Sequence, residues 1–385
     1  MRVVAVTGSY GKTTTARAMS AALLDGRPFR HVPNNATGVA QAVMRWRRGD
    51  PWGVIEAAIA HPGQMAAYAR MIRPDVAVVT GVGSEHNRIM RTIERTRHEK
   101  WQLVRALPPS GLAVLNGDDP NVMWMAGRTR ARVVTFGLGE HNDVRAEGIR
   151  LDWPRGTRFI VHMDGRRLEA STGLIGRHMV RPVLAALAVA AASGLEIGRV
   201  LAHLAALKPE LGRMQPVLLQ NGAFLLRDDY KSALETVFAA LDTLAEIPAE
   251  RKIVVMGSVA EPPGRGRPIH RAVGRRVAEV ADMAVFIGTS RAALASGAAR
   301  AGMPRDAILK AGAGVAPAIE HLTETVAPGD VILIKGRGSQ RLERVALALQ
   351  GRTVACALQD CQVQGLTCGS CPRLAAGPGL PVDTG

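Results

Sequence analysis

The residues with the clearest chemical signature lie close to the N-terminus. Residues 7–14 read Thr-Gly-Ser-Tyr-Gly-Lys-Thr-Thr, after a β-branched run at 3–7 and before a helical pattern at 12–24. Small residues let backbone N–H groups face phosphate oxygens, and the N-terminus of the helix adds its dipole. In such a loop the lysine neutralises phosphates and the next hydroxyl binds Mg²⁺. The residues that we predict to hold the phosphates of a nucleotide are Gly8, Ser9, Gly11, Lys12, Thr13 and Thr14.

Two further polar side chains end or follow apolar runs. Glu56 lies near the end of a strand-type run at 52–57, and His86 follows another at 76–82. The carboxyl ends of parallel strands meet at one sheet edge, where open α/β sheets bind their ligands. A carboxylate at this edge suits Mg²⁺ near the Thr13 hydroxyl, because magnesium prefers oxygen ligands.

All the cysteines lie in one short C-terminal segment, at Cys356, Cys361, Cys368 and Cys371. The closing Cys-Gly-Ser-Cys has the spacing of a zinc knuckle, and four thiolates complete a tetrahedron. The first pair is spaced more widely. The segment therefore predicts either a metal site, with Zn²⁺ preferred over an iron–sulfur cluster, or a tail of free thiols. Bound zinc is expected to fasten the tail or to recruit a partner protein.

The elements that must position these residues alternate along the chain. We expect strands at 3–7, 52–57, 76–82 and 111–115, with helices at 12–24, 63–72 and 91–107. This alternation predicts a mostly parallel α/β sheet. Residues 145–174 differ, because the alternation at 158–162 and the Met-Asp-Gly turn at 163–165 predict a small β-rich insert. A helix at 178–193 is expected to follow.

A second α/β unit of Rossmann type is expected from residue 211. Its strands are predicted at 223–226, 252–256, 283–287 and 331–334, and its helices at 232–244, 271–281 and 341–349. The predicted fold is thus α/β, with a P-loop parallel-sheet domain at 1–210, a Rossmann-like domain at 211–350 and a Cys-rich tail at 351–385.

The composition limits the classes of protein to which the chain can belong. The chain has 385 residues, of which 47% are hydrophobic, enough for two or three domain cores. It has no apolar run of membrane-spanning length and no signal-peptide pattern, so we expect a cytoplasmic protein that does not enter membranes. The net charge is +16, but the arginines are scattered and aromatic residues make up only 4%. A nucleic-acid partner is therefore not expected.

The phosphate loop has its first glycine closer to Gly11-Lys12 than a usual Walker A loop. In this it resembles the Mur ligases and their relatives, including the folylpolyglutamate synthases. Further segments resemble this family in the same order over about residues 1–350, above all the member that adds D-alanyl-D-alanine in peptidoglycan synthesis. These segments are Pro33-Asn34-Asn35-Ala36-Thr37-Gly38, Val54-Ile55-Glu56, Gly83-Ser84-Glu85-His86, Glu99-Lys100, Leu115-Asn116-Gly117-Asp118-Asp119, Gly176-Arg177-His178, Gly212-Arg213, Asp228-Asp229-Tyr230 and Ile334-Lys335-Gly336.

The resemblance implies an ATP- and Mg²⁺-dependent ligase that activates a carboxylate as an acyl phosphate and joins it to an amine. The implied catalytic residues are Lys12, Glu56, His86 and Lys100, and the implied metal ligands are Thr13, Glu56, His86 and a carbamylated Lys100. Asn116 would contact adenine, while Arg213 and Asp229 would face the rest of the nucleotide. Asn35 and Lys335 would meet the substrates.

The sequence also departs from the family. Met1 lies almost inside the first strand, so we expect the domain that binds a uridine-diphosphate sugar to be absent. Met179 and Pro182 stand in a region where the family tends to have asparagines, and Lys231-Ser232 follows Tyr230 where it often has Asn or His and then Pro. The acid and amine substrates therefore stay open. A chain-extending ligase of the folylpolyglutamate or poly-γ-glutamate type, a non-catalytic P-loop scaffold and a nucleic-acid ATPase remain as alternatives.

Overall fold

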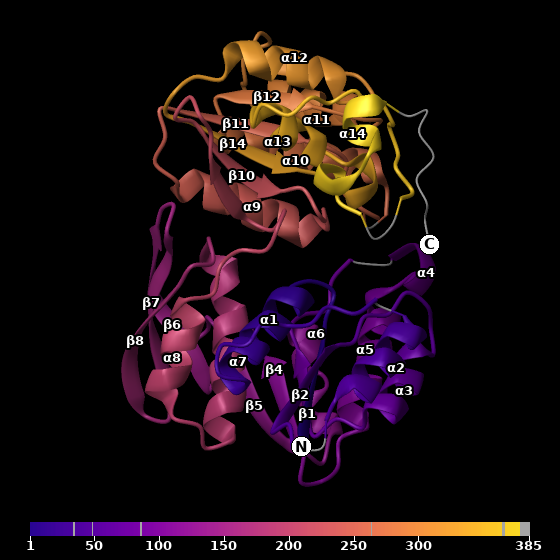
Figure 1. Ribbon diagram of the computed structural model, residues 1–385, viewed down its shortest axis with the longest axis vertical. Helices are drawn as coiled ribbons and strands as arrows, with labels where there is room; N and C mark the ends of the chain where they lie inside the picture. The colour runs from indigo at the N-terminus through magenta and orange to yellow at the C-terminus, as the bar shows by residue number, and fades with distance from the viewer. Residues whose placement is uncertain (34, 48, 85–86, 263, 364–365, 378–385) are drawn as a thin grey trace. The chain divides into compact units, whose positions relative to one another are not determined.

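The computed structural model describes residues 1–33, 35–47, 49–84, 87–262, 264–363 and 366–377. The chain divides into two compact units, Met1–Lys208 and Pro209–Gly385. Figure 1 shows that each unit has its own sheet with helices on both faces. The α/β fold class is confirmed, and the division lies close to the expected boundary at 210 and 211.

The first unit is built on an eight-stranded sheet in the order β2-β1-β3-β4-β5-β6-β7-β8. Strands β1 to β5 run parallel to their neighbours, as does β6 to β5. Their bounds are β1 (Arg2–Thr7), β2 (Trp52–Glu56), β3 (Val76–Val79), β4 (Leu112–Asn116), β5 (Arg132–Gly137), β6 (Val144–Asp152), β7 (Gly156–Met163) and β8 (Arg166–Thr172). Parallel order puts the carboxyl ends of β1, β2 and β3 at one edge, which is where the candidate residues were expected.

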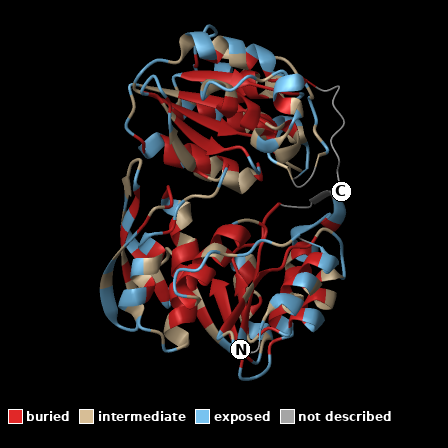
Figure 2. Ribbon diagram, in the orientation of Figure 1, coloured by how far each residue is buried: buried red, intermediate tan, exposed pale blue. Residues whose placement is uncertain are grey.

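Alternate residues of the strands form two separate cores. Val4 and Val6 of β1 pack on one face with α1 (Lys12–Leu23), α7 (Val180–Ala192) and α8 (Ile197–Ala205). Val3 and Ala5 point to the other face, which is covered by α2 (Ala36–Arg45), α3 (Gln64–Ile72), α5 (Ile93–Arg105) and α6 (Pro120–Met123). Short turns of helix complete the unit at α4 (Asn87–Met90), η1 (Ala126–Arg128) and η2 (Arg177–Met179). Figure 2 shows the strands buried between these partly exposed helices.

The expected β-rich insert consists of β6, β7 and β8. These strands pair antiparallel and extend the parallel sheet at its far edge. Met163 pairs with Arg166 across a two-residue turn in which Asp164 and Gly165 have positive φ values of 49° and 70°. Such a turn matches the twist of the paired strands, which explains the Asp-Gly sequence.

The second unit is a six-stranded sheet in the order β13-β12-β11-β14-β10-β9, in which only β9 is antiparallel. Its strands are β9 (Gln215–Leu218), β10 (Phe224–Asp228), β11 (Arg251–Met256), β12 (Met283–Phe286), β13 (Ile308–Lys310) and β14 (Asp330–Lys335). Its helices are α9 (Leu234–Glu246), α10 (Gly266–Val280), α11 (Arg291–Arg300), α12 (Ala316–Thr325), η3 (Gly338–Gln340) and α13 (Glu343–Leu349). One face packs against α12 and α13.

The Cys-rich tail belongs to this second unit and does not form a unit of its own. It carries η4 (Cys368–Ser370) and α14 (Arg373–Ala376). Cys368 and Leu374 pack against Leu347 of α13, which gives the tail a small apolar core. Within the described residues, no helix combines the length and the apolar character needed to cross a membrane.

Candidate active site

The loop between β1 and α1 has a backbone that glycine alone fits. Gly8 has a φ of 154°, and a Cβ there would lie 1.9 Å from the hydroxyl oxygen of Thr80. Gly11, with a φ of 76°, is the N-cap of α1, and no side chain of the described residues caps this helix. Its first N–H groups are therefore directed at the loop, which is the arrangement that binds phosphate.

Lys12 lies inside this loop. Its side chain is buried, and its Nζ donates hydrogen bonds to the carbonyl oxygens of Gly8 at 2.8 Å and Ser9 at 3.2 Å. The ammonium group is thus held beside the N-terminus of α1, where its charge and the helix dipole both favour an anion. The predicted role of Lys12 in binding phosphate fits this position.

Thr13 and Glu56 meet at the carboxyl ends of β1 and β2. The Thr13 hydroxyl donates to Oε2 of Glu56 at 2.7 Å, and both side chains are almost fully buried. Glu56 is placed by the parallel register, in which it pairs with Val6, one residue before the end of β1. The pair presents a hydroxyl and a carboxylate oxygen next to the phosphate loop. This donor set fits Mg²⁺, which binds hard oxygen ligands.

The segment after β3 packs against the phosphate loop. Ser9 Oγ accepts from the backbone N–H of Gly83 at 2.9 Å, and the N–H of Ser9 donates to the Gly81 carbonyl. Asp119, the N-cap of α6, accepts from the N–H of Val82. These bonds fix the segment that leads to His86. His86 itself lies outside the described residues, so its predicted role as a metal ligand stays a prediction.

Lys100 is one of the largest fully buried side chains, with an exposed fraction of 1%. It projects from α5, and its neighbour in that helix, Glu99, accepts a hydrogen bond from the N–H of Met65 in α3. Lys100 is therefore not a surface lysine. A buried lysine needs a partner for its charge or a change of its charge.

Asn116 and Asn35 have structural contacts of their own. Asn116 is buried at the end of β4, donates from its side-chain amide to the Thr80 carbonyl at 2.9 Å, and accepts from the N–H of Asp118. Asn35 is exposed and caps α2 by accepting from the N–H of Gly38. Both can still offer amide hydrogens, and their contacts with adenine and substrate remain predictions.

In the second unit, Arg213 and Asp229 are brought close together. The Arg213 guanidinium lies 4.6 Å from the ring centre of Tyr230, and the N–H of Tyr230 donates to the Gly212 carbonyl. Asp229 is buried and accepts two hydrogen bonds from Arg227, at 3.0 and 3.4 Å. Burial raises the pKa of the Asp229 carboxyl, while the charge of Arg227 acts against this rise.

Lys335 is placed differently from what its predicted role requires. Its side chain is 2% exposed, and its Nζ donates to Oδ2 of Asp228 at 2.5 Å, to the Lys231 carbonyl at 2.7 Å and to the Thr236 hydroxyl at 3.2 Å. All three N–H donors of the ammonium group are therefore used within the second unit. Lys335 holds the segment from 228 to 236, and a direct bond to the amine substrate would require one of these contacts to open.

Sequence reasoning missed several residues that organise these segments. Asp228 pairs with Lys335 across the register of β10 and β14, and both end apolar strands, which is a signal that the sequence does contain. Asp118 joins three segments by accepting from the N–H groups of Leu138 and Gly139 and from the guanidinium of Arg181. Burial would raise the pKa of Asp118, but these hydrogen bonds and the charge of Arg181 lower it below its usual value.

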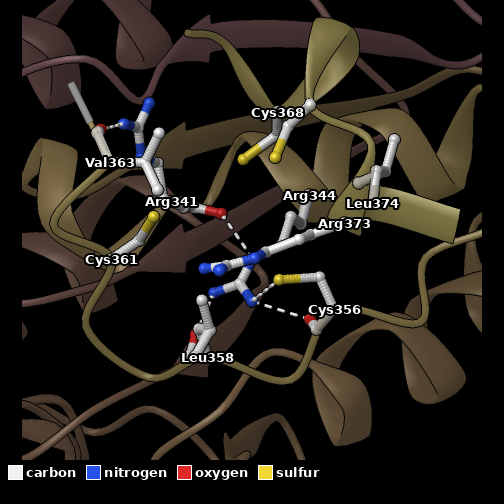
Figure 3. Close-up of a pocket in the computed structure, with 10 residues that line it drawn as sticks. Arg341, Arg344, Cys356, Leu358, Cys361, Val363, Cys368, Arg373 and Leu374 are labelled. Carbon is white, nitrogen blue, oxygen red and sulfur yellow. Dashed lines mark hydrogen bonds between the residues drawn. The ribbon is translucent and has the colours of Figure 1, made fainter. Parts of the chain in front are cut away.

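The four cysteines surround one pocket in the tail, together with Arg341, Arg344 and Arg373 (Figure 3). All four are free thiols. Within the described residues, no three or more His, Cys, Asp or Glu side chains lie close enough together to hold a metal ion. Burial raises the pKa of the Cys368 thiol to about 12, and the Glu343 carboxylate acts in the same direction. The thiols face their own unit, which gives no support to the expected partner protein.

Comparison with known proteins gives the family. The Mur ligase middle domain matches residues 6–190, and the Mur ligase glutamate ligase domain matches residues 212–338. The chain is 32% identical over 373 residues to the UDP-N-acetylmuramoyl-tripeptide--D-alanyl-D-alanine ligase of Mycobacterium tuberculosis, covering 91% of this chain and 73% of that protein. It is 29% identical to the enzyme of that name from Escherichia coli, of which it covers 77%.

A solved structure agrees with this result. The MurF ligase of Thermotoga maritima, determined in complex with ADP, superposes with a TM-score of 0.79 at 25% identity, over 91% of this chain and 79% of that one. MurF from Acinetobacter baumannii has the same fold, with a TM-score of 0.81 at 24% identity. Because the matches extend over the phosphate-loop unit and the second unit alike, the chain belongs to the Mur ligase family of ATP-dependent ligases that form amide bonds.

Proposed function

We propose that this protein joins a peptide or other small carboxylic acid to the amine of an amino acid or dipeptide, in the cytoplasm, with Mg²⁺-ATP as the energy source. The observation that carries the proposal is the Thr13–Glu56 hydrogen bond beside the buried ammonium group of Lys12. The names of the relatives, which act on a UDP-N-acetylmuramoyl tripeptide and D-alanyl-D-alanine, support a carboxyl-terminated peptide and a short D-amino-acid amine.

The proposed reaction has two steps that balance in atoms. A carboxylate oxygen of the acid attacks the γ-phosphorus of ATP, the bond to the β-γ bridging oxygen breaks, and ADP leaves. The amine nitrogen then attacks the acyl carbon, the acyl–oxygen bond breaks, phosphate leaves and the nitrogen loses a proton. Such transfers depend on positioning and on neutralising charge more than on covalent help from the protein.

The residues of the first unit supply that neutralisation. Lys12 and the first N–H groups of α1 would bind the phosphates, and Thr13 and Glu56 would hold Mg²⁺, which would neutralise negative charge on the phosphates. Lys100 and His86 are proposed to complete the metal ligands, with Lys100 as a carbamate because an ammonium group cannot bind a cation. Arg213 and Asp229 are proposed to contact the nucleotide.

Labelled oxygen tests the acyl phosphate directly. The acid is supplied with ¹⁸O in its carboxylate, and inorganic phosphate released with the amine present is analysed by mass spectrometry. The proposal predicts one labelled oxygen in the phosphate, because the acyl–oxygen bond breaks in the second step. Unlabelled phosphate, formed together with amide, would exclude the acyl phosphate while leaving the ligase intact.

The same assay separates the alternatives. A pool of UDP-sugar peptides with D-alanyl-D-alanine tests the relatives' reaction, and a pool of folate and γ-glutamyl chains with glutamate tests chain extension. Zinc in the C-terminal tail is a separate prediction, since no cysteine lies among the residues proposed for ATP, magnesium or the two substrates.

A further inference from the structure

The strongest feature that the ligase reaction does not use is the pocket formed by the tail and α13. Its wall contains all four cysteines of the chain and three arginines (Figure 3). The cysteines come from three parts of the tail, yet all four line the same pocket. A disordered tail of free thiols would give no reason for this convergence.

The backbones of the four cysteines are fixed before any ligand binds. The N–H of Cys361 donates to the Ser339 carbonyl at 2.7 Å, and the N–H of Cys368 donates to the Glu343 carboxylate at 2.8 Å. The carbonyl of Cys356 accepts from Arg344 at 2.7 Å. Cys371 closes the turn of η4 through a bond from its N–H to the Cys368 carbonyl. Rotation about the side-chain torsions is thus the movement left to the thiols.

Two guanidinium groups of the pocket bond mainly to backbone carbonyls. Arg344 is 1% exposed, and its guanidinium donates to the carbonyls of Gln340, Arg341, Cys356 and Leu358 and to the sulfur of Cys356. Arg341 donates to the carbonyls of Val363 and Leu366. Among the described residues, none of these partners is a carboxylate. A carboxylate, that of Glu343, does contact the cysteine segment, because it accepts from the N–H of Cys368.

We propose that Cys356, Cys361, Cys368 and Cys371 bind one Zn²⁺ ion as a tetrathiolate centre, with Arg341 and Arg344 as the surrounding donors. Four thiolates around Zn²⁺ carry a net negative charge, which the two guanidinium groups offset, and N–H donors around a metal's ligands commonly orient them. Because the thiols are not yet at metal-binding distances, binding rotates them inwards and releases their protons.

The position of the site gives it a structural consequence. Glu343 accepts from the N–H of Cys368 through one carboxylate oxygen, while the other lies 3.6 Å from Arg227. Arg227 in turn holds Asp229. A zinc ion that fixes Cys368 therefore also fixes the Glu343 carboxylate, which contacts Arg227. Zinc is a structural centre here and takes no part in the transfer of phosphate.

The experiment uses the full chain, purified under reducing conditions without a metal-affinity step. Metal content is measured by mass spectrometry, and the metal-free protein is then titrated with Co²⁺ as a spectroscopic substitute. We expect about one zinc per chain, together with sulfur-to-cobalt charge-transfer bands and tetrahedral d–d bands on titration. Each Cys→Ser variant is expected to lose these bands, whereas Ser370→Ala, in the same turn, retains them.

A thiol measurement keeps the result independent of variants that fail to fold. Since the chain has no cysteine outside the tail, alkylation of the wild-type protein reports on this pocket alone. Zinc is expected to slow alkylation of all four thiols together, and chelation is expected to restore it. Alkylation that zinc does not change, or a mass that shows disulfides in place of bound metal, would overturn the proposal. Neither result would bear on the ligase activity.

Discussion

Thr13 and Glu56 are 43 positions apart in the sequence, and the hydroxyl of the first donates to the carboxylate of the second at 2.7 Å. The parallel pairing of β1 and β2 produces this contact, because it places Glu56 opposite Val6, just before the phosphate loop. The two oxygens therefore stand where a divalent cation can bind both of them and the phosphates of a nucleotide.

Replacing Glu56 by Gln tests this pair. The amide keeps the size of the side chain and can still accept from Thr13, but it removes the negative charge that binds Mg²⁺. We expect the rate of ADP formation to fall roughly 100-fold or more, and the Mg²⁺ concentration for half-maximal rate to rise. A Mg²⁺ titration of the rate measures both. Glu140→Gln, at an exposed site of the same unit, is expected to behave as wild type; an unchanged Mg²⁺ dependence in Glu56→Gln would remove this residue from the metal site.

Lys100→Ala tests carbamylation. We expect activity to be lost and then partly restored by short carboxylic acids such as acetate, because these fill the space and supply the missing oxygen ligand. Wild-type activity is expected to fall when CO₂ and bicarbonate are removed. Lys310→Ala, at an exposed lysine, provides the matched control. Full activity of wild type in CO₂-free buffer, with no rescue of the variant, would contradict the carbamate.

Lys335→Met distinguishes a structural role from substrate binding. Without the ammonium group of Lys335, Asp228 becomes a buried carboxylate with no cation beside it. We expect the free energy of unfolding of the second unit to fall by about 3–5 kcal/mol. Thermal unfolding measures this, and Lys252→Met on the neighbouring strand serves as control. Direct contact with the amine substrate would instead leave stability intact and raise its KM.

Asp118→Asn removes the charge that binds Arg181 and two backbone N–H groups. We expect a loss of about 1–3 kcal/mol in the free energy of unfolding at neutral pH. Because the folded-state pKa of Asp118 is lowered from 3.8, its contribution is fully present above about pH 4. It is lost as the pH falls through the lowered value. The stability difference between wild type and variant should therefore shrink below pH 4, whereas Asp164→Asn, at an exposed turn, should show no such difference at either pH.

Arg344→Met tests what fastens the tail. The replacement keeps an apolar stem but removes the guanidinium bonds to four carbonyl oxygens, two of which, at Cys356 and Leu358, belong to the tail. We therefore expect the tail to separate from α13 and to be cleaved much faster by a protease. The exposed Arg352, which follows α13, makes a single side-chain hydrogen bond among the described residues, to the Gly369 carbonyl of the tail. Arg352→Met should therefore change the cleavage rate little. Equal rates for the two variants would show that the apolar contacts of Leu347, Cys368 and Leu374 are sufficient.

Much of the fold follows from local pattern. The strands at β1, β2, β11 and β14 were predictable because each is an apolar run bounded by polar or glycine residues. Elements with weaker patterns were missed, among them β9, which has one exposed edge and a proline, and α2, which begins at the Asn35 cap. The tail's attachment was also unpredictable, since Arg344 looks like any helical arginine until its four carbonyl partners are known.

The sequence placed the phosphate loop after the first strand and Glu56 at the end of the next strand, and both lie there in the structure. Their roles in binding ATP and Mg²⁺ stay predictions. Lys335 shows the limit of this reasoning. The family resemblance implied a substrate contact for Lys335, and that role stays a prediction, while in the structure its buried charge is satisfied by Asp228 across the strand register. A sequence does not reveal which of two neighbouring charged residues faces its partner and which faces a substrate.

The measurement that tests the central claim most directly is ADP release from Mg²⁺-ATP in the presence of bicarbonate and pooled acids and amines, compared between wild type, Lys12→Ala and Lys100→Ala. We predict ADP formation that requires an acid and an amine together and that disappears in both variants. ATP hydrolysis that depends on neither substrate and survives in Lys12→Ala, or a protein that does not bind ATP, would contradict a ligase at this phosphate loop.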